Sequence, residues 1–208
     1  MILNLILILG QFSSVAAETD LLSTTILKDM TLTYSQVEYM KTQYEKEQTS
    51  ELLGEMESST GTLEFSKGRL RVEEKNSENR NIFIKNKKTF WHLQPDNQVL
   101  MGPVSKAVPS IFEMMFSDPK VWDDLDSRIL KRDDNIAKIK ISMGKDRLNY
   151  SNFVVTINTK KRRFETISFE DEIGNATNIT FKNTSFFRKA KNKRFEYKPN
   201  KKDKVNSI

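Results

Sequence analysis

The chain of 208 residues contains no cysteine. Disulfides and thiolate metal sites are therefore excluded, so an exported form would be stabilised by burial and hydrogen bonding alone. Glycine and proline are also scarce, with 7 and 5 copies, and no glycine-rich loop for cradling phosphate is present. What the chain does contain is 13 phenylalanines, within 37% hydrophobic and 30% charged residues. This composition is too aromatic for a disordered chain, and the length fits one domain with a sizeable core.

Residues suited to catalysis are equally few. The chain has one histidine, His92, and no GxSxG motif that would present a nucleophilic serine. The acidic runs at 123–126 and 133–134 lack the glycine and the spaced ligands of a calcium loop. We therefore predict that the protein is not an enzyme, has no catalytic residues, and binds neither a metal nor a cofactor.

The N-terminus has the pattern of a secretory signal peptide over residues 1–17. An apolar run at 2–9 is followed by Val15-Ala16-Ala17, which places small residues before a cleavage site at Glu18. The run is too short to span a bilayer, and no cysteine follows it, which excludes a lipid-anchored lipoprotein. The n-region lacks Lys and Arg, so the alternative of a buried N-terminal strand or helix stays open. We expect an exported protein with a single domain over residues 18–208.

Positive charge is concentrated near the C-terminus. The net charge is +6, and the segment from Lys182 to Lys204 holds ten basic residues against Glu196 and Asp203. Such a block can bind nucleic acid or an anionic membrane surface. The alternative is a solvated strand pair with a frayed tail.

Hydrophobic periodicity predicts one helix followed by many strands. Residues 20–37 carry apolar side chains at helical spacing, with Asp20 as the expected N-cap. After about residue 40 the apolar residues alternate in short runs that are separated by turn signals such as Ser66-Lys67-Gly68 and Pro95-Asp96-Asn97. The runs lie at 63–65, 70–72, 82–84, 90–93, 139–141, 153–157, 167–169 and 179–181. Short strands without helical crossovers predict a mainly β fold with a curled or nearly closed antiparallel sheet.

A second helical region interrupts the strands at residues 106–126. Asp118-Pro119 divides it into two short pieces, and the first piece is dense in apolar residues, including Met114 and Met115. We expect both helical elements, 20–37 and 109–126, to lie on the concave face of the sheet. Flexible methionines beside phenylalanine suit a surface that adapts to an apolar partner, although ordinary core packing is the alternative.

Four motifs in order resemble the outer-membrane lipoprotein carrier family, LolA. The stretch 52–74 matches the family's pattern at Leu53-Gly54, Gly61, Leu63, Phe65, Lys67 and Arg71. The stretch 86–99 matches at Lys88, Trp91, Pro95, Gln98 and Val99. The stretch 167–183 matches at Asp171, Gly174, Asn175, Thr177 and Phe181, and the stretch 194–205 is similar to the family's closing motif at Pro199. The chain departs from the family by lacking the proline before the Arg71 strand and by carrying Val72 where tryptophan is frequent.

The resemblance implies a fold and a function. The fold is an incomplete, strongly curved antiparallel β-barrel in which helices form a lid over an apolar cavity. The function is that of a periplasmic chaperone that binds the acyl chains of lipoproteins and carries them to the outer membrane. The implied partners are acylated lipoproteins, an inner-membrane lipoprotein-releasing ABC transporter, and an outer-membrane receptor or the outer membrane itself; we expect a monomer that binds no nucleic acid.

The resemblance also implies the residues of the site. Those expected in the cavity and the lid are Leu63, Phe65, Arg71, Ile82, Ile84, Trp91, Ile111, Phe112, Met114, Met115 and Phe116. In the family an arginine latches the empty lid through hydrogen bonds to its backbone, and the candidates here are Arg71 and Lys67. Strand alternation favours Arg71 inside and Lys67 outside. Other hypotheses are a lipid-binding envelope sensor on the same fold, and a binder of anionic surfaces or nucleic acid that uses residues 182–204.

Overall fold

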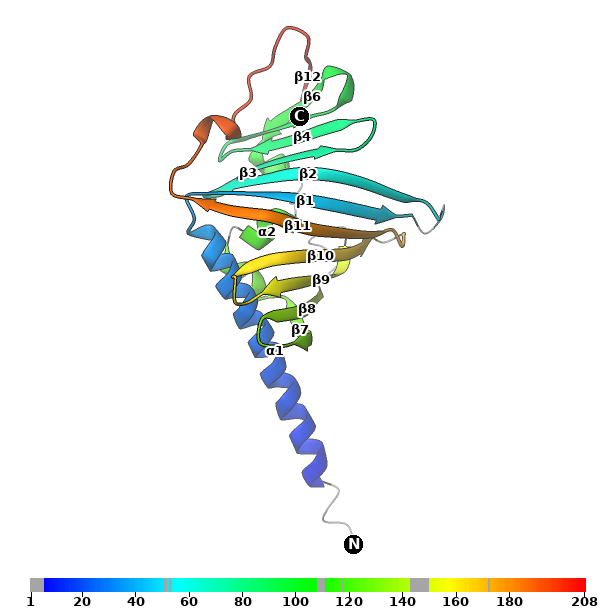
Figure 1. The fold of residues 1–208 in the computed structure, drawn as a ribbon, viewed down its shortest axis with the longest axis vertical. Helices are drawn as coiled ribbons and strands as arrows, with labels where there is room; N and C mark the ends of the chain where they lie inside the picture. The colour runs from blue at the N-terminus through cyan, green and yellow to red at the C-terminus, as the bar shows by residue number, and fades with distance from the viewer. Residues whose placement is uncertain are drawn as a thin grey trace.

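The computed structural model describes residues 6–50, 52, 54–107, 111–116, 118–142, 150–171 and 173–208. These residues form a single sheet of 12 strands in the order β12-β6-β5-β4-β3-β2-β1-β11-β10-β9-β8-β7 (Figure 1). The strands are β1 (Tyr39–Thr49), β2 (Met56–Ser66), β3 (Arg69–Lys75), β4 (Arg80–Lys85), β5 (Thr89–Leu93), β6 (Gln98–Pro103), β7 (Asp126–Arg132), β8 (Ile136–Ser142), β9 (Tyr150–Asn158), β10 (Arg163–Asp171), β11 (Ala176–Phe187) and β12 (Lys204–Ser207).

The helices of the described chain are fewer and mostly short. They are α1 (Ile6–Ser35), α2 (Ile111–Phe116) and the 3₁₀ turns η1 (Pro95–Asn97), η2 (Val104–Lys106), η3 (Pro119–Trp122) and η4 (Asn192–Phe195). Among the described residues, no helix is both long enough and apolar enough to cross a membrane.

The predicted antiparallel, incompletely closed sheet is confirmed. Every strand pair is antiparallel except the pair of β12 with β6, and the sheet ends in two edges, β12 and β7, that do not meet. All eight predicted strand runs lie within observed strands, whereas β1, β6, β7 and β12 were not predicted individually. The β2–β3 turn falls at Lys67-Gly68, where both residues have positive φ (49° and 76°), as in a two-residue hairpin turn that suits glycine.

The predicted helix over 20–37 is present, but its predicted start is wrong. α1 runs without interruption from Ile6 to Ser35, so Asp20 lies inside the helix and is not its N-cap. Cleavage before Glu18 would remove the first part of this helix, and that cleavage stays a prediction. The second helical region is observed as two pieces, α2 and η3, divided before Pro119 as predicted, and Pro119 is the first residue of η3. Pro109 lies outside the described residues.

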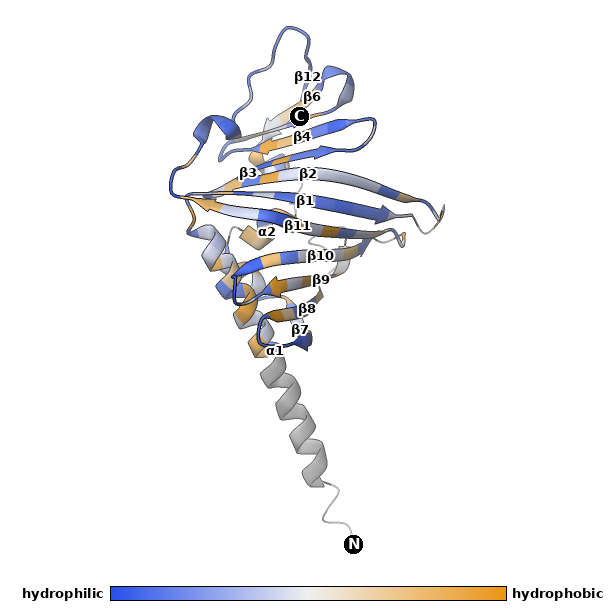
Figure 2. Cartoon of the chain, in the orientation of Figure 1, coloured by the Kyte–Doolittle hydropathy of each residue, from blue (hydrophilic) through white to orange (hydrophobic). Residues whose placement is uncertain are grey.

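The sheet has two faces with different coverings. We call the face that carries α2 the inner face and the opposite one the outer face; α2 lies behind β11 in Figure 1. The main core forms on the inner face, where side chains of α1 and α2 pack against strands from both halves of the sheet. Apolar residues accordingly gather on α2, on the part of α1 beside the sheet, and on β8 and β9 (Figure 2).

α1 and α2 are also joined by specific contacts. Tyr34 stacks on Phe116 with ring centroids 4.9 Å apart, and its hydroxyl accepts a hydrogen bond of 3.2 Å from the Phe164 amide. Thr31 Oγ1 donates to the Met115 carbonyl at 2.9 Å and accepts from Trp122 Nε1 at 2.8 Å. Because these groups are buried, α1, α2 and η3 form one connected unit on the inner face.

Candidate functional site

A pocket of about 550 Å³ lies on the inner face, beside α2. It is bounded by strands from both halves of the sheet and by the C-terminal residue of the chain. Its apolar lining consists of Phe83, Phe90, Leu100, Ile111, Phe112, Phe169, Ile179 and Ile208. This volume falls within the roughly 300–1,000 Å³ of typical small-molecule sites.

The lining is positioned by strand register. Phe83 of β4 stacks on Phe90 of β5 at a centroid distance of 6.0 Å, and the β4–β5 and β5–β6 pairing brings Leu100 of β6 to the same face. From the other side, Phe112 of α2 contacts the rings of Tyr44 at 6.1 Å and Phe181 at 6.2 Å. Phe112 therefore lies between the sheet and the pocket, and it is the aromatic side chain that α2 contributes to the lining.

Polar groups occupy part of the pocket wall. Glu74 accepts a hydrogen bond from Lys46 Nζ at 2.9 Å and another from the Tyr44 hydroxyl at 3.2 Å. Burial and the neighbouring Glu74 carboxylate raise the pKa of Tyr44, so this phenol stays protonated and donates. His92 also lines the pocket, and burial lowers its pKa, which favours the neutral imidazole.

Tyr44 lies directly over a glycine on the neighbouring strand. Gly61 pairs with Tyr44 across β1 and β2, and a Cβ atom at position 61 would be 2.1 Å from Tyr44 Cζ. No side chain larger than hydrogen fits there while the ring keeps its place. The glycine thus lets the tyrosine ring lie flat on the sheet at the pocket wall.

An ion pair fastens α2 to the sheet at this pocket. Lys85 of β4 pairs with Glu113 of α2, and their side chains are 14% and 19% exposed. Together with the Thr31–Met115 hydrogen bond, this pair holds the short helix from two sides. Among the described residues, no group of three or more potential metal-ligating side chains is found.

The structure divides the residues expected in the cavity and lid between two faces. Leu63 and Phe65 are on the inner face and are packed in the main core. In α2, Ile111 and Phe112 line the pocket, Met115 and Phe116 are buried in the core, and Met114 is half-buried against it.

Ile82, Ile84 and Trp91 lie on the outer face, contrary to expectation. Ile84 pairs with Trp91 across β4 and β5 and forms, with Val99, a second apolar cluster that is separate from the main core and is covered by Tyr197. The segment 82–84 is apolar at all three positions, so alternation alone does not tell which residues face inward. Phe83 does so in their place.

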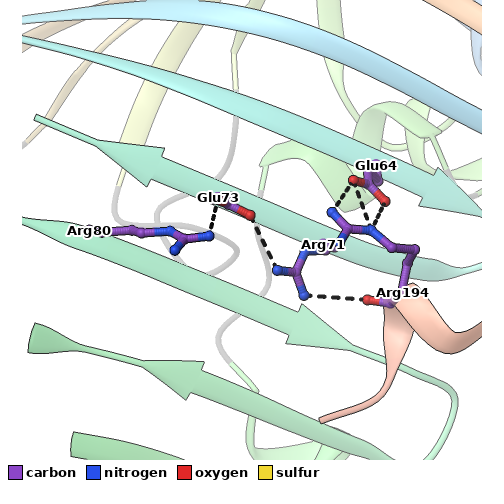
Figure 3. Close-up of polar contacts among 5 residues, drawn as sticks. All are labelled: Glu64, Arg71, Glu73, Arg80 and Arg194. Atoms are coloured by element: carbon purple, nitrogen blue, oxygen red, sulfur yellow. Dashed lines mark hydrogen bonds and ion pairs between the residues drawn. The ribbon is translucent and has the colours of Figure 1, made fainter. Parts of the chain in front are cut away.

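Arg71 and Lys67 also do not contact α2 in the described structure. Arg71 pairs with Ile84 in the sheet and therefore shares its outer face. Its guanidinium donates to Glu73 at 3.2 Å and to the Arg194 carbonyl at 3.5 Å (Figure 3). Lys67 forms an exposed ion pair with Glu38. Neither side chain is placed to form the expected latch on α2.

Arg71 belongs instead to a charged network that anchors the C-terminal segment. Glu64 is 1% exposed and accepts hydrogen bonds from Arg194 Nε at 3.0 Å and from Nη2 at 2.6 Å (Figure 3). Burial raises the pKa of Glu64, but hydrogen bonds from Arg194 and Tyr39 outweigh burial and hold the pKa below its usual range. A bidentate arginine is the geometry that best compensates a buried carboxylate.

The described residues thus form an open, mostly antiparallel sheet with helices and a pocket on its inner face. The chain belongs to the LolA family: residues 35–198 match the model described as outer membrane lipoprotein carrier protein LolA. The match covers the sheet from β1 to β11 together with α2 and η4, and it leaves most of α1 and all of β12 outside.

Solved structures are similar to this chain at low sequence identity. An uncharacterised conserved protein from Thermus thermophilus shares the fold, with a TM-score of 0.58 at 12% identity, over 88% of this chain and 97% of that one. A putative outer membrane lipoprotein-sorting protein domain from Vibrio parahaemolyticus has a TM-score of 0.45 at 9% identity, over 83% and 95% of the two chains. A LolA superfamily protein from Nitrosomonas europaea has a TM-score of 0.43 at 10% identity, over 82% and 97%. The comparison with curated protein sequences gives no significant match.

Proposed function

We propose that this protein binds the acyl chains of lipoproteins in the pocket beside α2 and carries them through the periplasm. In this proposal it receives lipoproteins from an inner-membrane ABC transporter and delivers them to an outer-membrane receptor or to the outer membrane itself. Residues 1–17 would direct export and be removed. The observation that carries the proposal is the pocket of about 550 Å³ with its mainly apolar lining, in a chain that belongs to the LolA family.

The physical requirement for such a carrier is strong. Burying an acyl chain is favourable by about 0.8 kcal/mol per CH₂, so an acylated protein does not cross water without a shield. The rings of Phe83, Phe90 and Phe112 supply an apolar wall for the chains. The polar group formed by Tyr44, Lys46 and Glu74 suits the ester or amide end of the ligand, because it presents both donors and acceptors at the wall.

α2 is the element that we propose moves when the acyl chains enter. It spans only Ile111–Phe116, and it is joined to the sheet by the Lys85–Glu113 ion pair. Opening would expose Ile111 and Phe112 to water and separate the two charges, so hydrophobic burial and the attraction between Lys85 and Glu113 both favour the closed, empty state. We therefore assign the latch to Lys85 and Glu113, in place of Arg71 or Lys67.

The binding test is a matched pair of substitutions on α2. Phe112→Asp places a carboxylate in the pocket wall, where its desolvation against acyl chains is costly. Met114→Asp places the same group on the same helix at a half-buried position that does not line the pocket. With a fluorescent fatty-acid probe, we expect affinity to fall more than tenfold in Phe112→Asp and by less than threefold in Met114→Asp. Equal affinities in both variants, with both folded by circular dichroism, would place the acyl site elsewhere.

A transfer assay then tests the carrier role itself. The protein is loaded with a labelled lipoprotein from donor vesicles and mixed with acceptor vesicles or a purified receptor. Transfer that depends on Phe112 supports a carrier. Probe binding without any unloading would instead indicate a lipid-binding sensor on this fold.

A further inference from the structure

The basic C-terminal segment is docked on the sheet and is not a frayed tail. We call residues 188–203 the C-terminal strap; it leads from the end of β11 to β12 (Figure 1), and it contacts the outer face through Arg194 and Tyr197. Arg194 binds the buried Glu64, and Phe195 is fully buried with the Arg69 guanidinium 5.0 Å from its ring centroid. Beyond η4, Tyr197 packs on the outer-face cluster of Ile84, Trp91 and Val99, and β12, which follows the strap directly, pairs with β6. The strap is thus held at both of its ends.

The docked strap carries a large excess of positive charge on its exposed side. It contains eight basic residues against Glu196 and Asp203. The exposed lysines of the strap are Lys189, Lys191, Lys193, Lys198, Lys201 and Lys202. Within the described part of the chain, none of these six forms an ion pair, although Lys191 lies over the rings of Tyr39 and Phe187. Figure 2 shows most of the strap as hydrophilic.

This charge does not serve the fold. Like charges on one ordered segment repel each other, and of the six ammonium groups only that of Lys191 has a contact among the described residues, over the rings of Tyr39 and Phe187. The anchoring is done by Arg194, Phe195 and Tyr197, which are different residues. The lysines are therefore available to an external anionic surface, and the anchors hold them in a fixed arrangement before binding.

Apolar side chains stand at both ends of the strap. Phe187 pairs with Tyr39 at the end of β11 and is 42% exposed. Val205 of β12 pairs with Val99, a residue of the outer-face cluster, and is 39% exposed. Basic side chains beside exposed apolar ones match the headgroup and acyl-boundary layers of a membrane. Single-stranded nucleic acid would require a row of open aromatic faces for base stacking, and the strap itself exposes none.

We infer that the C-terminal strap is a binding site for the surface of an anionic phospholipid bilayer. The lysines would contact the headgroup phosphates, while Phe187 and Val205 would enter the boundary of the acyl layer. This site is on the face opposite the pocket, so the inference does not rest on the proposed carrier function. It would hold the protein at a membrane while leaving α2 and the pocket uncovered.

The test compares two triple variants of the full chain in vesicle co-sedimentation. Lys198→Gln, Lys201→Gln and Lys202→Gln together remove three charges from the strap, where each lysine near an anionic surface strengthens binding about fivefold. The control, Lys131→Gln, Lys138→Gln and Lys160→Gln, removes the same charge from exposed positions on the β7–β9 side. We expect the strap variant to bind vesicles containing phosphatidylglycerol roughly a hundredfold more weakly than the unmodified protein, and the control to bind within threefold of it.

Three results would overturn the inference. The first is an equal loss of vesicle binding in both triple variants, which would mean that binding depends only on the net charge of the protein. The second is binding to vesicles of phosphatidylcholine alone that is as strong as binding to vesicles containing phosphatidylglycerol. Such binding would occur through the pocket or the N-terminus, neither of which requires anionic lipid. The third is binding of a labelled oligonucleotide, lost in the strap variant, without any vesicle binding. Thermal unfolding of both variants confirms that they are folded, and neither triple touches an anchor of the strap.

Discussion

Replacing Arg194 with leucine tests the anchor of the strap most directly. The substitution leaves the carboxylate of Glu64, which is 1% exposed, without its bidentate partner. Removing one member of a fully buried ion pair costs about 3–5 kcal/mol. The Arg194 side chain is 43% exposed, so water can reach part of the vacated space, and we expect a smaller loss of about 2–3 kcal/mol in the free energy of unfolding. For a chain of this size that corresponds to a decrease in Tm of roughly 5–10 °C.

The assay is chemical and thermal unfolding with two matched variants. Lys193→Leu removes a neighbouring exposed charge and should change the free energy of unfolding by less than about 0.5 kcal/mol. Glu64→Gln in the Arg194→Leu background removes the unpaired charge and should recover at least half of the loss. Glu64→Gln is expected to be stabilising in the Arg194→Leu background because Glu64 is buried and its charge has lost its partner there.

The Glu64–Arg194 ion pair also predicts that the stability of the protein depends on pH. The pKa of Glu64 is held below its usual range in the folded protein, so its stabilising contribution is present above about pH 4.3 and is lost as the pH falls through the lower folded value. In Arg194→Leu, burial is opposed only by the Tyr39 hydrogen bond and the charge of Arg71, so the carboxyl group protonates more easily. The difference in stability between the two proteins should therefore shrink below about pH 4.

Two outcomes would contradict the role of the Glu64–Arg194 ion pair as the anchor of the strap. If Arg194→Leu loses no more stability than Lys193→Leu, the ion pair does not anchor the strap. If Glu64→Gln further destabilises Arg194→Leu, the carboxylate is compensated by groups other than the arginine.

Further predictions concern the pocket and the N-terminus. Gly61→Ala forces the buried ring of Tyr44 off the sheet and should cost about 1–3 kcal/mol in unfolding experiments; an unchanged Tm would contradict the close contact. Lys85→Met removes one partner of the ion pair with Glu113 and should open α2, which is measured as faster loading of the fatty-acid probe; unchanged loading would remove this pair as the latch. Intact-mass measurement of the exported protein should show a chain beginning near Glu18, and retention of residues 1–17 would exclude the predicted cleavage.

The amino-acid sequence determined the fold class and the family. Alternating pairs such as Leu63 and Phe65, or Ile139 and Ile141, define strands with one buried face, and turn residues such as Gly68 separate them. These signals are local, because each depends on residues only a few positions apart. The motifs that resemble the LolA family likewise lie within short stretches, and the family match over residues 35–198 confirms them.

Where residues on both faces of a strand are apolar, the sequence does not tell which of them point to the inner face. The run 82–84 and the neighbouring Trp91 read equally well with either face inward. Pairing with β3 and β5 places Ile84 and Trp91 outside and Phe83 inside, because a residue shares its face with its cross-strand partners. A shift of one residue would exchange the two sets.

The partners of the charged residues follow only from the tertiary structure. Glu64 and Arg194 are 130 positions apart, and Lys85 and Glu113 are 28 apart, so no local pattern connects either pair. Strand alternation favours placing Arg71 inside, but pairing with Ile84 places it on the outer face, where the docked C-terminal strap supplies the carbonyl that it contacts. A buried charge is stable only beside a partner, and the partner is brought there by the path of the whole chain.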